Sequence, residues 1–293
     1  MIYAVKFVLW LLSLMPVGMP YWLSEKSARF WMKLSPVKRH TTERNLERCY
    51  PDMSEEERQR LVHESFQHYV CSVLEAGHNW NWSLDRLIAL CDGVENENLL
   101  LEAQASDKGL ILLAPHFGAW EYLGAYFQKF EDIAILYKPA SNPQLEKALL
   151  AKRSRGESVL IAASGRGLNK LYQHLKSGKC AGILPDQQPA PGKGEFAPFF
   201  GNEALTSNVV PRLAKKLDCI VLGLICERLK GGRFRVHVLP AEEGIYSEDA
   251  REALTAMNRT IEKCVAVNPS QYLWSYRRFK AQPEGAEPFY DFR

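Results

Sequence analysis

Residues 109–115 read GLILLAP, a run that contains no charged or hydrogen-bonding side chain. Apolar runs of this length are typical of strands that are buried on both faces, as in the parallel sheets of α/β proteins. Further strand candidates lie at 133–137, 158–163, 180–184, 219–226 and 234–239. Helical patterns separate several of them, at 119–130, 167–175, 207–217 and 248–267. This alternation predicts an α/β fold in which a central, largely parallel or mixed sheet is flanked by helices.

A long helix is predicted ahead of these strands. Residues 54–57 read SEEE and fit a capping box, in which a serine and a glutamate close the first turn of a helix. An apolar stripe at helical spacing follows and extends the helix to about Trp80. Because no repeat, low-complexity tract or linker divides the chain, we predict one α/β domain over residues 24–293, with a helical segment at its start.

Composition narrows the class of protein. The 293 residues are 46% hydrophobic and 24% charged, which are values of a globular chain with a core of ordinary size. The net charge of +3 is too small to indicate a nucleic-acid partner, so none is predicted. The seven cysteines form no C-x-x-C pair and their number is odd, which favours reduced thiols over a disulfide framework. No H-E-x-x-H motif occurs, and we predict no metal.

The amino terminus is unusually hydrophobic. Residues 2–23 read IYAVKFVLWLLSLMPVGMPYWL, and Lys6 is the one charged residue among them. About 20 apolar residues cross a bilayer as a helix, but Pro16, Gly18 and Pro20 interrupt this stretch. No small-residue cleavage site of a signal peptide follows. We therefore predict a membrane anchor over residues 1–23 that either spans the bilayer or lies in its interface, with a buried core helix as the alternative.

The segment after this anchor is basic. Seven basic residues stand against three acidic ones between positions 24 and 48: Lys26, Arg29, Lys33, Lys38, Arg39, Arg44 and Arg48 against Glu25, Glu43 and Glu47. Such a segment is attracted to anionic lipid headgroups and favours a cytoplasmic location for the domain that follows. Nearby tryptophans and tyrosines also suit a membrane interface. A solvated helix face is the alternative interpretation of these charges.

A histidine and a glutamate directly follow the apolar run at 109–115. His116 lies just past the predicted strand, Gly118 permits a tight turn, and Glu121 falls in the first turn of the next helix. A carboxylate bonded to one imidazole nitrogen fixes the tautomer, which leaves the other nitrogen free to accept a proton from a hydroxyl. Ligands of such folds gather at the carboxyl ends of the strands. We therefore predict that His116 is a general base oriented by Glu121, although this spacing also occurs by chance.

Four ordered segments carry a family resemblance: HFGAWE at 116–121, YKPASNP at 137–143, LPDQQPAPGKGEFAPFFG at 184–201 and QYLWSYRRFK at 271–280. With them the chain resembles the lysophospholipid acyltransferase superfamily, within its bacterial lipid A (lauroyl/myristoyl) acyltransferase branch. The broad superfamily usually has aspartate as the acidic partner of the histidine. The lipid A branch has glutamate, as this chain does at position 121.

The resemblance implies a reaction, its substrates and a place in the cell. A fatty acyl group passes from the thioester of an acyl carrier protein to a hydroxyl of a lipid A precursor, as a secondary acylation in lipopolysaccharide biosynthesis. The enzyme acts at the cytoplasmic face of the bacterial inner membrane. It uses no cofactor and no metal, with acyl-acyl carrier protein as co-substrate. His116 acts as general base and Glu121 orients it, without a covalent acyl-enzyme.

The resemblance also implies substrate-binding or oxyanion roles for three further residues. Arg153 aligns with an arginine of the family, with Arg155 as the second choice, and this cation contacts the oxyanion or a substrate phosphate. Asp186 ends the strand predicted at 180–184 and therefore reaches the same sheet edge as His116. It orients Arg153 or binds the acceptor. A basic helix face and a structural turn are the alternatives for the arginines and for Asp186.

Three other functions stay open on the sequence. In the first, the chain is an acyltransferase of the same superfamily whose acceptor is another glycolipid, an aminolipid or a lysophospholipid. In the second, it is a hydrolase that uses His116, Glu121 and Asp186 around a metal. In the third, it is a lipid-binding protein that has the fold without the catalysis.

Overall fold

The computed structural model describes residues 2–130, 132–139, 142, 146–147, 150–151, 158–190 and 192–290. Its helices are α1 Ile2–Ser13, α2 Met19–Leu34, α3 Pro36–Cys49, α4 Glu55–Asn81, α5 Leu84–Ile88, α6 Glu97–Gln104, α7 Trp120–Tyr126, α9 Gly165–Lys176, α10 Val209–Leu217 and α11 Ala250–Val267. Its strands are β1 Cys91–Glu95, β2 Leu110–Leu113, β3 Ala134–Tyr137, β4 Val159–Ala162, β5 Cys180–Ile183, β6 Gly194–Phe199, β7 Asn202–Ser207, β8 Ile220–Arg228 and β9 Phe234–Pro240. The predicted α/β fold is confirmed.

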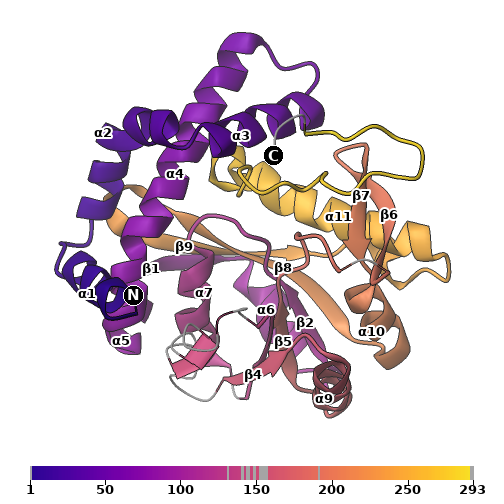
Figure 1. The fold of residues 1–293 in the computed structure, drawn as a ribbon. Helices are drawn as coiled ribbons and strands as arrows, with labels where there is room; N and C mark the ends of the chain where they lie inside the picture. Colours follow the sequence, from indigo (N-terminus) through magenta and orange to yellow (C-terminus); the bar gives the residue numbers. More distant parts are fainter. Residues whose placement is uncertain are drawn as a thin grey trace.

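Seven strands form the central sheet in the order β1-β9-β8-β2-β5-β3-β4. All neighbours pair in parallel except β8 and β9, which are antiparallel, so the sheet is mixed. The apolar run at 109–115 supplies β2, whose four residues are all buried at the centre of the sheet. Strands β6 and β7 form a separate antiparallel hairpin beside α11 (Figure 1), which the sequence patterns did not predict.

Helices cover both faces of the sheet. Alternate residues of β2 point to opposite faces: Leu110 and Leu112 belong to a buried cluster with α5, α6 and α7, and Ile111 and Leu113 belong to one with α9, α10 and α11. A third buried cluster joins α3 and α4 to α11 and to the segment that follows it, with Trp274 and Phe279 among its members. The resulting helix–sheet–helix arrangement leaves the carboxyl ends of the parallel strands open for a site.

The first four helices lie together at one side of the sheet (Figure 1). Helix α4 is the longest, and its capping box is confirmed: the Ser54 side chain accepts a hydrogen bond from Glu57 N, and Glu57 accepts one from Ser54 N. Helices α1 and α2 pack on α4. The approach of α1 is close, because a Cβ added at Gly77 of α4 would lie 2.4 Å from Leu12 Cβ.

The hydrophobic stretch 2–23 does not form one helix. Helix α1 ends at Ser13 and α2 begins at Met19, with Pro16 in the break between them. Among the residues that the structure describes, no helix combines the length and the apolarity needed to cross a bilayer. Of the two forms predicted for the anchor over residues 1–23, the spanning helix is not found, since the apolar stretch forms two shorter helices, and the interfacial form stays a prediction.

Candidate active site

His116 and Asp186 lie at the ends of two adjacent strands. Strands β2 and β5 pair in parallel with Leu113 opposite Ile183, and each site residue follows its strand by three positions. Because the two strands are neighbours and both residues lie equally far beyond them, the side chains of His116 and Asp186 come together. The Asp186 carboxylate bonds His116 twice: Oδ1 lies 2.8 Å from the ring Nδ1, and Oδ2 accepts the backbone N–H at 2.9 Å.

The environment of Asp186 keeps this carboxylate ionised. Burial by itself raises its pKa, but the charge of His116 and the hydrogen bonds that His116 donates outweigh burial and hold the pKa below its usual range. An ionised carboxylate accepts hydrogen bonds and donates none, so the proton at the contact belongs to Nδ1 of His116. The lone pair of the imidazole is then on Nε2. The side-chain amide of Gln187 lies 3.1 Å from this nitrogen and donates to it.

The imidazole faces an open cavity of about 260 Å³. Most of the lining side chains are apolar, and they come from α4, α5, α7, the turn that follows α7, β3 and the end of β5: Trp80, Leu84, Leu87, Trp120, Ala125, Phe127, Ile135, Leu136 and Leu184. The polar lining residues besides His116 are Asn79, Glu121, Gln187, which contacts the imidazole, and Tyr137 and Lys138 at the end of β3. This combination suits a long apolar chain that ends in a reactive polar group.

Glu121 lines the same cavity from the first turn of α7. The structure therefore brings three of the predicted site residues to one place: His116, Glu121 and Asp186. The role given to Glu121, to orient the imidazole, stays a prediction, whereas the hydrogen bond to Nδ1 that the geometry establishes is made by Asp186. Arg153 and Arg155 lie outside the described residues.

Four polar residues of the cavity were not predicted as site residues: Asn79, Tyr137, Lys138 and Gln187. Lys138 follows β3, and Gln187 follows Asp186, and both belong to segments that carry the family resemblance. Position at the carboxyl end of a predicted strand was the signal that pointed to them. Over the described part of the chain, no group of three or more His, Cys, Asp or Glu side chains is placed to hold a metal ion.

The turn that carries His116 requires glycine at position 118. Gly118 has φ +56°, and a Cβ there would lie 2.1 Å from the carbonyl oxygen of Cys226. The close approach allows β8 to bond the turn, since Ala119 N donates to Cys226 O at 2.9 Å. The segment after α11 bonds it from another side: Gly118 N donates to Gln271 O, and Leu273 N donates to His116 O. The backbone around the imidazole is thus held by two segments distant in sequence.

Comparison with known proteins agrees with this architecture. The family model described as bacterial lipid A biosynthesis acyltransferase matches residues 1–281. The chain is 29% identical over 285 residues to the lipid A biosynthesis lauroyltransferase of Escherichia coli (strain K12), which covers 97% of this chain and 92% of the relative. The palmitoleoyltransferase of the same organism gives the same figures.

The lipid A biosynthesis myristoyltransferase of that organism is 24% identical over 261 residues, covering 88% of this chain and 80% of the relative. The family model spans nearly the whole chain, and the residues it matches include His116 and Glu121, which line the cavity, and Asp186, which bonds His116. The chain therefore belongs to the bacterial lipid A biosynthesis acyltransferase family.

Proposed function

We propose that this chain transfers a fatty acyl group from the thioester of an acyl carrier protein to a hydroxyl of a lipid A precursor. The observation that carries the proposal is the Asp186-bonded imidazole of His116 in the wall of a mainly apolar cavity, in a member of this family. The cavity offers apolar walls to the acyl chain and an imidazole to the reacting groups. No cofactor is needed for this transfer.

His116 serves as the general base. Its Nε2 accepts the proton of the acceptor hydroxyl while the hydroxyl oxygen attacks the thioester carbonyl. The tetrahedral intermediate then collapses, the carbon–sulfur bond breaks, and the imidazolium returns the proton to the leaving thiolate. Asp186 holds the Nδ1–H tautomer and stabilises the imidazolium by its charge. Gln187 bonds Nε2, so the incoming hydroxyl takes its place.

The remaining site residues have supporting roles in this proposal. Glu121 lies in the cavity close to the reacting groups, and it orients His116 or the acceptor hydroxyl. The negative charge that develops on the thioester oxygen needs a cation or a hydrogen-bond donor. Lys138 lines the cavity and is one candidate. Arg153, or Arg155, is the other candidate on the basis of the family resemblance.

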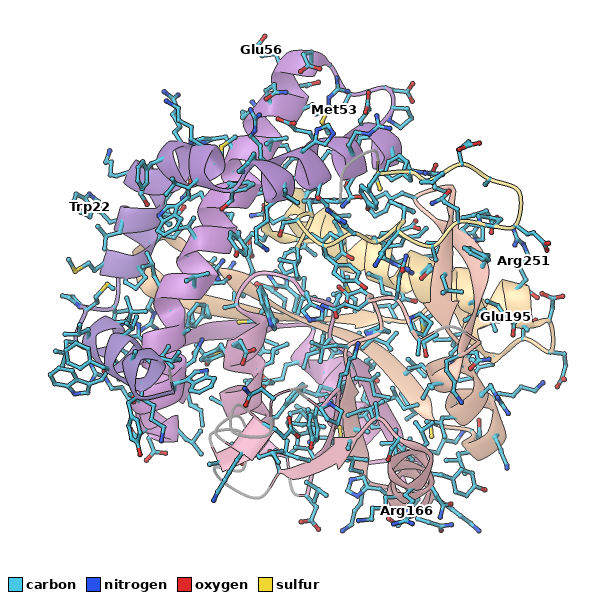
Figure 2. All side chains as sticks on the ribbon, in the orientation of Figure 1. Trp22, Met53, Glu56, Arg166, Glu195 and Arg251 are labelled. Atoms are coloured by element: carbon cyan, nitrogen blue, oxygen red, sulfur yellow. The ribbon has the colours of Figure 1, made fainter. Side chains whose placement is uncertain are left out.

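The enzyme works at the cytoplasmic face of the inner membrane in this proposal, with α1 and α2 in the lipid interface. Large apolar side chains are exposed on these two helices: Tyr3, Val5, Phe7, Val8, Trp10, Leu11, Met19, Trp22, Phe30, Trp31 and Leu34. Trp22 extends from the outer side of α2 (Figure 2). Contiguous apolar surface of this kind is typical of lipid or protein contact sites.

The test is acyl transfer in detergent by the purified full chain. The donors are acyl carrier proteins loaded with C10 to C16 chains, the acceptor is tetra-acylated lipid A precursor with its inner sugars attached, and mass spectrometry detects the product. We expect the acceptor to gain the mass of one acyl group. His116→Ala is expected to lower the rate by about 10²–10⁴-fold, since it removes the general base.

His63→Ala is the matched control, because His63 lies on α4 and does not line the cavity, and we expect this variant to keep the full rate. No transfer from any donor by the folded protein would remove the lipid A acceptor and direct the search to other glycolipids, aminolipids and lysophospholipids. Full transfer by His116→Ala would show that the base lies elsewhere.

A further inference from the structure

Arg228, the last residue of β8, is buried among groups that surround the His116 turn. Its side chain is 0% exposed and that of Glu75, on α4, is 6% exposed. The guanidinium and the carboxylate are joined by two hydrogen bonds, from Nε to Oε1 at 2.8 Å and from Nη2 to Oε2 at 2.7 Å. This bidentate geometry fixes the plane of the guanidinium as well as its position.

The same guanidinium bonds the backbone of the His116 turn. Its Nη2 lies 3.0 Å from the carbonyl oxygen of Gly118 and 2.9 Å from Ser72 Oγ. Its Nη1 donates to Nδ1 of His68 at 3.2 Å. His68 accepts this bond in its neutral form, because burial and the charge of Arg228 lower the pKa of His68 to about 3. The guanidinium therefore joins α4 to the turn that carries the general base.

The backbone of Arg228 is held as firmly as its side chain. Gln271 accepts from Arg228 N at 2.8 Å and donates to Arg228 O at 2.9 Å. The backbone oxygen of the same Gln271 accepts from Gly118 N. Both hydrogen-bonding groups of the Gly118 backbone are thus occupied, its N–H by Gln271 and its carbonyl by Arg228. The position of this peptide is determined from two sides, two residues after His116.

A buried ion pair stabilises the contact between α4 and β8 only weakly, because both of its charges lose their hydration. The free energy lost when two charges leave water often exceeds the free energy gained from their attraction. Apolar side chains of similar volume often give equal or greater stability. What an apolar pair does not supply is a directed hydrogen bond to the Gly118 carbonyl.

We propose that Arg228 and Glu75 are positioning residues, which fix the Gly118 peptide and so direct Nε2 of His116 into the cavity. This proposal rests on the proposed function for its kinetic test.

The kinetic test replaces the pair without removing its volume. Arg228→Met/Glu75→Leu in the full chain fills the site with apolar side chains, and we expect its melting temperature to stay close to that of the unsubstituted protein. Because the bond to Gly118 is lost, we expect kcat to fall by about 10–100-fold, since a misplacement of about 1 Å at a reacting group has an effect of this size. We expect KM for the acceptor to change by less than about twofold.

The control is the matched double variant Glu227→Leu/His237→Phe. It removes a hydrogen-bonded pair between β8 and β9, whose side chains lie 2.9 Å apart, and Glu227 is adjacent to Arg228. We expect kcat to be unaffected, because these side chains are not among those that bond the His116 turn. If the Arg228–Glu75 pair had only a structural role, the two double variants would have similar kcat values.

A second measurement is independent of turnover. In the unsubstituted protein, NMR of the His116 ring is expected to show the Nδ1 proton bonded to Asp186 and shifted downfield. Arg228→Met/Glu75→Leu is expected to shift or broaden this signal, while the control leaves it in place. If no donor supports transfer, the proposed function fails and this signal still tests the positioning.

An unchanged kcat together with an unchanged Nδ1 signal in the folded Arg228→Met/Glu75→Leu variant would overturn the proposal. If that variant does not fold, Glu75→Gln decides by the same two measurements. This substitution keeps the shape of the side chain and removes its charge. We then expect a smaller loss of kcat, of about 3–10-fold, with KM unchanged, and an unaltered kcat and signal would again overturn the proposal.

Discussion

The carboxylate that bonds Nδ1 of His116 is that of Asp186, because Asp186 follows β5, the strand that pairs with the His116 strand β2. Asp186 and His116 follow paired parallel strands at equal distance, whereas Glu121 reaches the same cavity from the first turn of α7. The two carboxylates are therefore placed differently: Asp186 bonds the imidazole of His116, and Glu121 lines the cavity that the imidazole faces. Single substitutions of Asp186 and of Glu121 separate the effects of the two carboxylates on the proposed reaction.

We expect Asp186→Asn to lower kcat by about 10²–10⁴-fold, because an amide in this place no longer stabilises the imidazolium and permits the wrong tautomer of His116. The measurement is steady-state acyl transfer between pH 5 and 9. The low pKa of Asp186 means that its own protonation contributes nothing to the profile in this range. Activity equal to that of the unsubstituted protein would rule out the assigned role.

Glu121→Gln is the comparison. A loss of kcat as large as that of Asp186→Asn would support the predicted action of Glu121 on the imidazole. A change confined to KM for the acceptor would assign Glu121 to the substrate hydroxyl.

At the scale of single elements, α4 connects most of the functional parts. It begins in a capping box, it packs on α1 and α2, its last turns reach the cavity with Asn79 and Trp80, and it carries Glu75 and His68. His68 is buried and neutral, and its pKa is lowered from 6.5 to about 3 by burial and by Arg228. This residue couples the stability of the fold to pH.

Between pH 6.5 and 3 the unfolded chain binds a proton at His68 that the folded chain does not bind. Stability therefore rises with pH in this range, and the contribution of His68 is fully present above pH 6.5. We expect the melting temperature to fall as pH is lowered from 7 to 4. His68→Asn, which keeps an acceptor for Arg228, is expected to reduce this slope. Differential scanning calorimetry at several pH values measures it.

His63→Asn is the control on the same helix. His63 lies on the same helix and is less buried than His68, so its replacement shows what the loss of another histidine of α4 does to the slope. An equal slope in the unsubstituted protein and in His68→Asn would contradict the assignment of the pH dependence to His68.

At the scale of the whole molecule, one side presents both apolar and basic groups. The exposed apolar side chains of α1 and α2 continue into an open groove between α2, α3 and α4. Four of the residues that line the groove are cationic: Arg29, Lys33, Arg39 and Arg60. Anionic lipid headgroups attract such a surface, with roughly 1 kcal/mol for each cation near the membrane. This side of the molecule is the one that the proposed membrane location requires.

We expect the full chain to bind vesicles that contain 30% anionic phospholipid more tightly than vesicles of zwitterionic lipid. Neutralising the four cations to glutamine should weaken binding to the anionic vesicles by roughly 10²–10³-fold, which corresponds to four charges at about 1 kcal/mol each. Vesicle co-sedimentation measures this, and acyl transfer in detergent should stay unchanged.

The control neutralises four exposed cations of α9 and α10, namely Arg166, Lys170, Lys176 and Arg212. Arg166 lies at the edge of the molecule away from α2 (Figure 2). An equal loss of binding in the control would show that vesicle binding depends on the net charge of the protein and not on the cations of the groove. Unimpaired binding of the first variant would remove the groove from the membrane contact.

Much of the fold and part of the site followed from local patterns in the sequence. The strands at 109–115, 180–184 and 219–226 were predicted because a central strand shows its burial in its own residues. The capping box of α4 was predicted because both of its partners lie within one helical turn. Placement of His116 after a buried strand and of Asp186 after another was enough to bring both to one sheet edge.

Other features depended on groups that are distant in the chain. The β6–β7 hairpin has weak alternation, and it is stabilised in part by its contact with α11, so its own residues did not predict it. The division of residues 2–23 into two helices depends on Pro16 and also on the surface of α4, which receives α1 at Gly77.

The sequence by itself determined six of the seven strands of the central sheet, the place of His116 at the end of a strand and the family that the four segments resemble; the edge strand β1 was not predicted. The tertiary structure alone decided which carboxylate bonds the His116 imidazole and that Arg228 bonds Glu75, 153 positions away in the chain. The physical reason is the range of the interactions. Helix caps and strand burial are set by residues a few positions apart, whereas a buried ion pair exists only after strand order and helix packing have placed its partners in contact.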